Sequence, residues 1–191
     1  MLTSGDIAAA SENQQKLSQA GYQFCLIGGV ALQRWGEPRY TQDVDLTLLC
    51  PFGEELAVGR RLEALVPPRI NEAVAFAVES RVYLGETANG TPVDIALGAI
   101  EFEHRCVHRA SDYEIIDGVV LRTCGADDLI VMKAFANRDR DWVDVGGIIV
   151  RQGSTLDWDL IESELAPLLA VRGGRDVSDR LSGLRSKYAN R

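Results

Sequence analysis

The chain lacks the features that mark membrane and secreted proteins. It has no apolar run near the roughly 18 residues that a membrane-spanning helix requires. Its N-terminal segment carries Asp6 and Glu12 instead of the basic and then apolar pattern of a secretory signal. We therefore expect a cytoplasmic protein that does not act in a membrane.

Cysteine and histidine are scarce, and their spacing argues against a zinc or disulfide framework. The four cysteines are far apart, form no C-x-x-C pair and sit inside or beside apolar runs, so we expect buried free thiols. His104 and His108 could share one face of a helix, as metal ligands sometimes do. No H-E-x-x-H motif or nearby third ligand accompanies them, which makes a zinc site the weaker interpretation.

The composition is that of an ordinary globular domain. Of 191 residues, 46% are hydrophobic and 25% are charged, and no repeat or flexible linker interrupts the chain. Short apolar or alternating runs predict the strands, and longer periodic segments predict the helices. The expected strands are 22–27, 43–48, 74–78, 81–84, 92–97, 113–116 and 119–123. The expected helices are 4–20, 30–35, 54–65, one starting at 126, 139–150, 157–169 and 177–187.

This order of elements predicts an α+β fold, a mixed sheet with helices. We expect a core over residues 1–125 and a helical C-terminal lobe over 126–191, packed together as a single compact unit.

Charge is distributed unevenly along the chain. The net charge is −8, yet residues 172–191 carry a local charge of +4, which leaves −12 on residues 1–171. An acidic body does not favour non-specific binding to nucleic acid, because neutralisation of phosphates supplies most of that affinity. The basic C-terminal stretch could dock RNA or could be a solvated helix face.

Three aspartates have the spacing of a metal site. Asp43 and Asp45 lie two residues apart on one face of a predicted strand, with Cα atoms roughly 6.5 to 7 Å apart. Asp94 occupies the corresponding polar face of another strand. Carboxylates of this kind suit Mg²⁺ or Mn²⁺. A lone D-x-D is often only a polar strand edge, and Arg39 could neutralise these charges instead of a metal.

A glycine pair follows the first predicted strand. Gly28 and Gly29 stand where a strand passes into a helix, and their backbone N–H groups could approach a phosphate at the helix N-terminus. Neither a Walker loop nor G-x-G-x-x-G is present. A glycine pair at such a turn can also serve only to relieve a steric clash.

Taken together, these motifs resemble the DNA polymerase beta-like nucleotidyltransferase superfamily. The residues that carry the resemblance are Gly28-Gly29, Arg39-x-Thr41-x-Asp43-x-Asp45 and Val93-Asp94-Ile95. The downstream segment 126–136, followed by Arg138 and by Asp141-Trp142-Val143-Asp144, is similar to the bacterial AbiEii/AbiGii toxin-type branch. The similarity covers about residues 22 to 150.

The resemblance implies the polymerase beta-like fold, with helices on one side of a mixed sheet, and it assigns roles to the motif residues. Gly28 and Gly29 would contact the triphosphate, and Asp43 and Asp45 would bind both metals. Asp94 would bind one metal and help to deprotonate the acceptor. Many relatives have Gly-Ser at the glycine pair, so a serine hydroxyl is missing here.

The remaining implied residues would bind or support the nucleotide. Lys133 would reach a phosphate from the helical lobe, and Arg39 and Thr41 would support the site. Asp141 would lie near the active-site cleft, although pairing with Arg138 or Lys133 explains it equally well.

The functional hypothesis is a Mg²⁺- or Mn²⁺-dependent nucleotidyltransferase that moves NMP from an NTP to an acceptor hydroxyl. In the toxin-like version the acceptor is RNA, such as a tRNA 3′ end, and a separate antitoxin protein restrains the enzyme. One alternative is a small-molecule acceptor, as in aminoglycoside or lincosamide nucleotidyltransferases. The acidic body of the chain would suit a cationic aminoglycoside. Another alternative is a non-catalytic relative that binds nucleotide or RNA.

Overall fold

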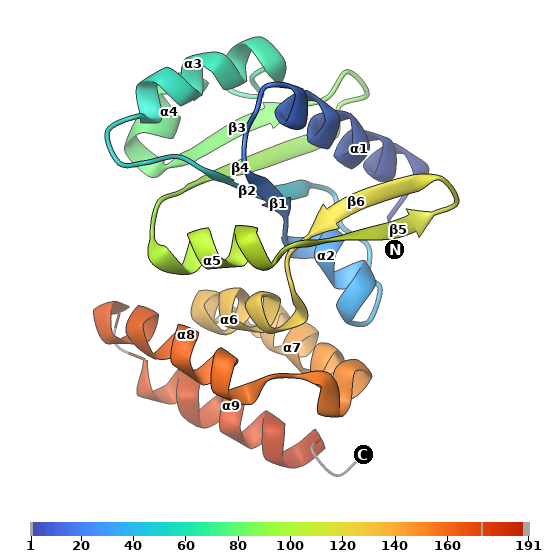
Figure 1. The fold of residues 1–191 in the computed structure, drawn as a ribbon, viewed down its shortest axis with the longest axis vertical. Helices are drawn as coiled ribbons and strands as arrows, with labels where there is room; N and C mark the ends of the chain where they lie inside the picture. Colours follow the sequence, from blue (N-terminus) through green and yellow to red (C-terminus); the bar gives the residue numbers. More distant parts are fainter. Residues whose placement is uncertain (1, 173, 189–191) are drawn as a thin grey trace. The chain divides into compact units, whose positions relative to one another are not determined.

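A mixed β-sheet organises the N-terminal part of the chain (Figure 1). The computed structural model describes residues 2–172 and 174–188. These residues group into two units, one of residues 1–31 and 39–124 and the other of residues 32–38 and 125–191. The segment 32–38, which includes the second half of helix α2 (Gly28–Trp35), therefore groups with the C-terminal helices.

Within the described residues the sheet has six strands in the order β3-β4-β2-β1-β6-β5. Strand β1 runs antiparallel to β2 and parallel to β6, β2 runs parallel to β4, and β3 and β5 are antiparallel edge strands. The strands are β1 (Phe24–Leu26), β2 (Val44–Leu49), β3 (Val82–Glu86), β4 (Pro92–Gly98), β5 (Ser111–Ile116) and β6 (Val119–Thr123). The predicted mixed sheet flanked by helices is confirmed.

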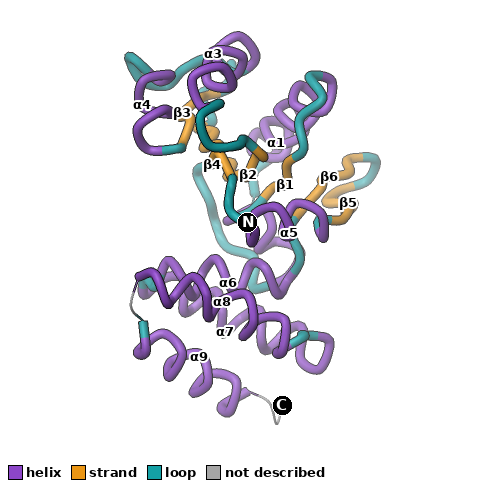
Figure 2. The backbone as a smooth tube through the Cα atoms, turned by 60° about the vertical axis from the view of Figure 1, so that its left-hand side comes forward, coloured by secondary structure: helices purple, strands orange, loops and turns teal. Residues whose placement is uncertain are grey.

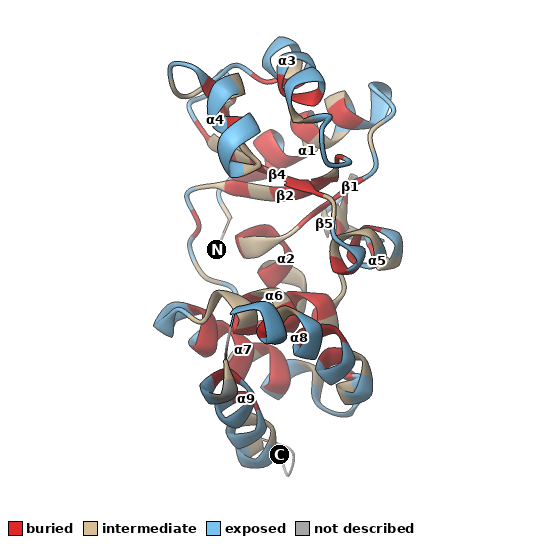
Figure 3. Ribbon diagram, turned by 90° about the vertical axis from the view of Figure 1, so that its left-hand side faces the viewer, coloured by how far each residue is buried: buried red, intermediate tan, exposed pale blue. Residues whose placement is uncertain are grey.

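One face of the sheet carries the main apolar core. The alternation predicted for β2 and β4 is present: Val44, Leu46 and Leu48, and likewise Val93, Ile95 and Leu97, are buried within it. Three helices cover this face, α1 (Ser4–Gln19), α3 (Glu55–Leu65) and α4 (Ala73–Ser80) (Figure 3). Each fully buried side chain of this type contributes about 1.5–3 kcal/mol.

The opposite face is covered by helix α5 (Glu101–Arg109). Cys25 alternates with Phe24 and Leu26 along β1, and its Sγ lies 3.9 Å from the Sγ of Cys106 on α5. The expectation of helices on one side of the sheet was therefore wrong. The side chains of Asp45 and Asp94 belong to this second face, because they alternate with the core residues of their strands.

The second unit consists of helices (Figure 2). Its elements are the end of α2, then α6 (Ala126–Ala136), α7 (Asp139–Gln152), the short turn η1 (Gly153–Thr155), α8 (Trp158–Arg172) and α9 (Arg175–Tyr188). The end of α2 is attached to α7 by hydrogen bonds: Gln152 donates to the Trp35 carbonyl at 2.7 Å, and Arg151 donates to the Gly36 carbonyl at 2.6 Å.

Two predicted elements differ from the structure. Residues 74–78 were expected to form a strand but belong to helix α4, whose Ala73 and Ala77 face the core one turn apart. A short apolar run does not distinguish strand from buried helix, and its alanines favour helix. Helix α5 was missed, although Phe102, Cys106 and Val107 mark its buried face.

All four cysteines are buried and free, as expected. In α5, the His108 ring nitrogen Nδ1 lies 2.7 Å from the carbonyl oxygen of His104, one turn earlier on the same helix. Within residues 2–172 and 174–188, no helix is long and apolar enough to cross a membrane.

Candidate active site

Two of the three predicted aspartates lie side by side on neighbouring strands. Asp45 of β2 is directly opposite Asp94 of β4 in the parallel pairing. Neighbouring strands are about 4.8 Å apart, so both carboxylates project from the same face within reach of one cation. Asp43 immediately precedes β2, and all three aspartates are partly accessible. The parallel pairing of β2 with β4 thus brings Asp45 and Asp94 together, and Asp43 lies one residue before β2.

Thr41 fixes the first of these aspartates. Its side chain is 5% exposed, and its hydroxyl donates a hydrogen bond of 2.6 Å to Oδ1 of Asp43. The bond leaves the other carboxylate oxygen, Oδ2, to accept further partners. Thr41 therefore orients the carboxylate of Asp43.

The glycine pair lies directly against these residues. Gly28 has a φ of +55°, a conformation that strongly favours glycine, and a Cβ at this position would overlap the Asp45 carboxylate. A Cβ on Gly29 would lie 2.5 Å from Oγ1 and 2.7 Å from Cβ of Thr41. Both glycines are thus required for close approach to the aspartate strand. Thr41 also occupies the space into which a serine at position 29 would project.

The backbone at this turn joins the first strand to the aspartate strand. The amide of Ile27 donates to the Asp45 carbonyl at 2.9 Å, which continues the antiparallel pairing to the edge of helix α2. Gly28 and Gly29 then form the first turn of α2. The N–H groups at the start of a helix point towards its N-terminal end, where they can contact an anion.

Arg69 is a site residue that the sequence did not reveal. Its Nη2 donates to Oδ1 of Asp94 at 2.6 Å, and the two side chains are 28% and 32% exposed. The only sequence cue nearby is the Pro67-Pro68 pair, which predicts a chain break but no partner. Sequence reasoning had named Arg39 as a possible counter-ion. Arg39 is partly buried, and its Nη1 donates to the carbonyl of Tyr40.

The aspartate carboxylates are chemically suited to a divalent metal, although they do not converge on one point as a complete set of ligands. Among the described residues, no three His, Cys, Asp or Glu side chains converge as metal ligands. Asp94 is engaged by Arg69, and one oxygen of Asp43 is engaged by Thr41. The carboxylates of Asp43, Asp45 and Asp94 are nevertheless the oxygen ligands that Mg²⁺ and Mn²⁺ prefer.

Lys133 and Asp141 belong to the helical unit, where they form a buried ionic cluster. Lys133 is 6% exposed, and its Nζ lies 2.6 Å from Oδ2 of Asp144 and 3.5 Å from Oδ1 of Asp141. Arg138 reaches Oδ2 of Asp141 at 2.7 Å. Both partners that the sequence offered for Asp141 are therefore present. Asp144 is the additional member of the cluster.

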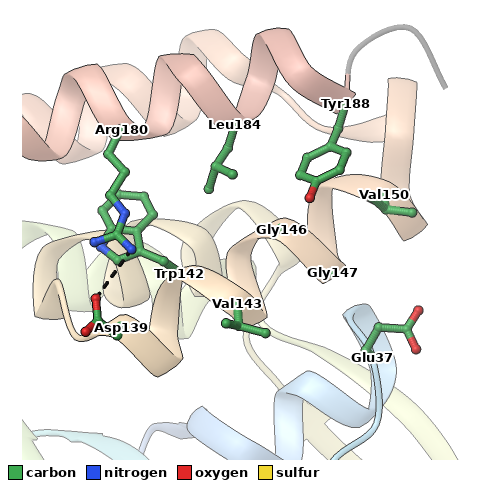
Figure 4. Close-up of a pocket in the computed structure, with 10 residues that line it drawn as sticks. All are labelled: Glu37, Asp139, Trp142, Val143, Gly146, Gly147, Val150, Arg180, Leu184 and Tyr188. Carbon is green, nitrogen blue, oxygen red and sulfur yellow. Dashed lines mark hydrogen bonds and ion pairs between the residues drawn. The ribbon is translucent and has the colours of Figure 1, made fainter.

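A hollow of about 520 Å³ lies within the helical unit (Figure 4). Gly146 and Gly147 of α7 form part of its wall, and Tyr188 and Leu184 of α9 face them. Arg180 stacks on the Trp142 ring at 4.8 Å. None of the three aspartates lines this hollow, so its size alone does not mark it as the catalytic site.

Comparison with known proteins gives a likeness of fold. No family model and no curated protein matches the sequence. A nucleotidyltransferase-like antigenic protein from Paracoccidioides brasiliensis has a similar structure, with a TM-score of 0.50 and 17% identity over 95% of this chain and 94% of that chain.

The antibiotic-resistance factor ANT(2'')-Ia is also similar. Its solution structure has a TM-score of 0.47 and 16% identity over 99% of this chain and 96% of its own. Its complex with adenylyl-2''-tobramycin has a TM-score of 0.48 and 19% identity over 97% and 100%. The likeness to the Paracoccidioides protein confirms the predicted nucleotidyltransferase-like fold.

Proposed function

We propose that the protein is a nucleotidyltransferase that moves NMP from an NTP to an acceptor hydroxyl with the help of Mg²⁺ or Mn²⁺. One observation carries the proposal: Asp45 and Asp94 lie opposite each other on parallel strands, and Gly28 at the start of α2 packs against Asp45. Carboxylates beside an anion-binding helix start are the groups that transfer of a nucleotidyl group requires.

In the proposed reaction the acceptor oxygen attacks the α-phosphorus of the NTP. A new P–O bond forms, the bond from the α-phosphorus to the bridging oxygen breaks, and pyrophosphate leaves. Asp94 accepts the proton of the acceptor hydroxyl, directly or through water. The N–H groups at Gly28 and Gly29 hold the triphosphate. Asp43, Asp45 and Asp94 would hold the divalent metal, which would neutralise charge on the phosphates.

The helical unit would supply further contacts to the nucleotide. We place Lys133 at a phosphate and Asp141 beside it, as the resemblance to the AbiEii/AbiGii branch implies. The Lys133 ammonium lies 2.6 Å from the Asp144 carboxylate. To bind a phosphate, it must therefore break this ion pair and contact the nucleotide instead. Arg39 and Thr41 would support the aspartates.

The acceptor that we propose is RNA, such as a tRNA 3′ end, with a separate antitoxin protein as a partner. The segment 126–144 supports this branch. The basic charge of helix α9 adds a contact surface for RNA, although two of its arginines are already engaged: Arg180 lies over Trp142, and Arg185 lies over Trp158.

The proposal is tested by incubating the protein with each labelled NTP, Mg²⁺ and total RNA, with aminoglycosides and lincosamides as parallel acceptors. We expect label in RNA, and its loss in Asp43→Ala. Asp112→Ala is a matched control, because Asp112 is an exposed aspartate of edge strand β5. Transfer of label to an aminoglycoside or lincosamide would show that the acceptor is a small molecule and would leave the proposed reaction intact. Absence of label on any RNA, protein or small molecule would contradict the proposal, and nucleotide binding without turnover would indicate a non-catalytic relative.

A further inference from the structure

The segment 66–69 runs alongside edge strand β3 and places the guanidinium of Arg69 beside Asp94, in the row of carboxylates formed by Asp45 and Asp94. Pro68 forms an antiparallel bridge with Gly85, and the amide of Arg69 donates to the Leu84 carbonyl at 3.0 Å. The amide of Glu86 donates to the Pro67 carbonyl at 2.9 Å. These bonds fix the backbone of Arg69 at the edge of the sheet.

Arg69 is thereby aligned with the aspartates across the strands. Leu84 of β3 lies opposite Asp94 of β4, and Asp94 lies opposite Asp45 of β2. The backbone of Arg69 is therefore two strand spacings from Asp94, about 9.6 Å. The long arginine side chain covers this distance and places Nη2 at 2.6 Å from Oδ1 of Asp94.

Gly85 permits this arrangement. A Cβ at Gly85 would lie 2.6 Å from Cγ1 of Val66 and 3.2 Å from the Pro67 carbonyl oxygen. Any larger residue there would push the segment 66–69 away from β3. The segment 66–69 can approach β3 closely because Gly85 has no side chain, and this approach allows Arg69 to reach Asp94.

We infer that Arg69 is a built-in counter-cation that competes with the divalent metal for Asp94, so that metal binds fully only when the Arg69–Asp94 ion pair opens. The inference deepens the proposed function and rests on it, because it concerns metal loading of the same site. A guanidinium at ion-pair distance occupies a carboxylate oxygen and adds a positive charge beside the metal position. Arg69 therefore positions Asp94 and regulates its availability as a ligand.

The test measures the affinity of the full chain for Mn²⁺ alone by calorimetry, with thermal unfolding as a check of folding. Arg69→Gln removes the charge, and we expect it to tighten Mn²⁺ binding about tenfold, since the ion pair is only partly screened by solvent. Arg69→Lys retains the charge and should stay near wild type. Arg122→Gln is the control, because Arg122 of β6 pairs with Asp112 at 3.8 Å in the same unit.

Two further variants separate the ion pair from general effects on folding. Gly85→Ala displaces the segment without changing any charge and should also tighten Mn²⁺ binding. In an Asp94→Asn background, Arg69→Gln should have no effect, because its partner has lost its charge. Tighter Mn²⁺ binding by folded Arg69→Gln or folded Gly85→Ala supports the inference, provided that the effect disappears in the Asp94→Asn background. Mn²⁺ affinity that is unchanged within about twofold or weaker in the folded variants, or absent from every form, overturns it.

The outcome is distinct from that of the proposed function. A protein whose Mn²⁺ affinity depends on Arg69 but which transfers no label keeps the inference and loses the proposed activity. A protein that transfers label while Arg69→Gln leaves Mn²⁺ affinity unchanged does the reverse.

Discussion

Gly28 and Asp45 are in such close contact that the carboxylate occupies the space where a side chain at position 28 would begin. The contact joins the turn that starts helix α2 to the strand that carries the aspartates. The glycine is required twice, once for its φ of +55° and once for the missing Cβ.

Gly28→Ala should abolish nucleotidyl transfer and weaken Mn²⁺ binding, because the methyl group displaces the Asp45 carboxylate. Gly53→Ala provides the matched control. Gly53 has a φ of +90°, but apart from its two chain neighbours no group of the described residues lies within 4 Å of the position that an alanine methyl would occupy. Both substitutions carry the backbone penalty of about 1–2 kcal/mol for a left-handed conformation. Equal transfer rates in the two variants would show that the contact with Asp45 is unimportant.

Thr41→Val should lower the transfer rate about 10- to 100-fold, the usual effect of removing a hydrogen bond that orients a metal ligand. Valine keeps the shape of threonine but cannot donate to Oδ1 of Asp43. Thr47→Val is the control, since Thr47 is 3% exposed and lies in the same strand as Asp45. Steady-state transfer rates and Mn²⁺ affinity measure the effect, and a rate equal to that of Thr47→Val would exclude the orienting role.

Lys133→Met should destabilise the protein by about 3–5 kcal/mol, because it leaves a buried carboxylate without its cation. Lys133→Met combined with Asp144→Leu should recover part of this loss in chemical denaturation. If Lys133 contacts a nucleotide phosphate, transfer remains lost in the stabilised double variant. Recovery of transfer together with stability would instead assign Lys133 a structural role.

Tyr83→Phe should remove a pH dependence at alkaline pH. Burial, reinforced by the negative charge of Glu63, raises the pKa of Tyr83 to about 12. Between an unfolded-state pKa of about 10 and this value, the unfolded chain releases the proton first, so stability falls as the pH rises. Tyr83→Phe should lack this part of the slope and lose about 1 kcal/mol at neutral pH with its hydrogen bond to the Val66 carbonyl.

Unfolding midpoints between about pH 8 and pH 12 measure the effect of Tyr83, because this range spans both pKa values. Tyr40→Phe, which removes a hydroxyl from a residue that is 57% exposed, is the control. Identical alkaline slopes in wild type and Tyr83→Phe would contradict the prediction.

Asp127→Asn should raise the melting temperature at neutral pH. Burial, with the nearby charges of Asp128 and Asp157, raises the pKa of Asp127 against the opposing hydrogen bond from the Asp157 amide. The folded state then binds more protons than the unfolded one above pH ~3.9, so stability is lost as the pH rises through the raised pKa. The advantage of the variant should therefore shrink as the pH falls towards about 4. An advantage that grows on acidification would reverse the assigned sign.

The polar and apolar faces of the aspartate strands could be read from the sequence, because alternation is a local property. The pairing of Asp45 with Asp94 could not, since the register of two parallel strands depends on the crossover between them. The contact of Arg69 with Asp94 could not be predicted for a similar reason. The position of Arg69 depends on a bridge to β3 and on the space left by the missing side chain of Gly85. The run 74–78 was misread because the periodicity of five apolar residues does not distinguish a strand from a buried helix.

The parallel pairing of β2 with β4 also has a consequence for folding order. The chain between Asp45 and Asp94 includes α3, α4 and β3, and all of it must be traversed before the two strands can meet. Closing such a long loop is slow compared with forming a helix or a hairpin. We therefore expect Asp45 and Asp94 to come together late in folding. Mn²⁺ binding during refolding would accordingly report on the completion of the sheet, whereas helix content would recover earlier.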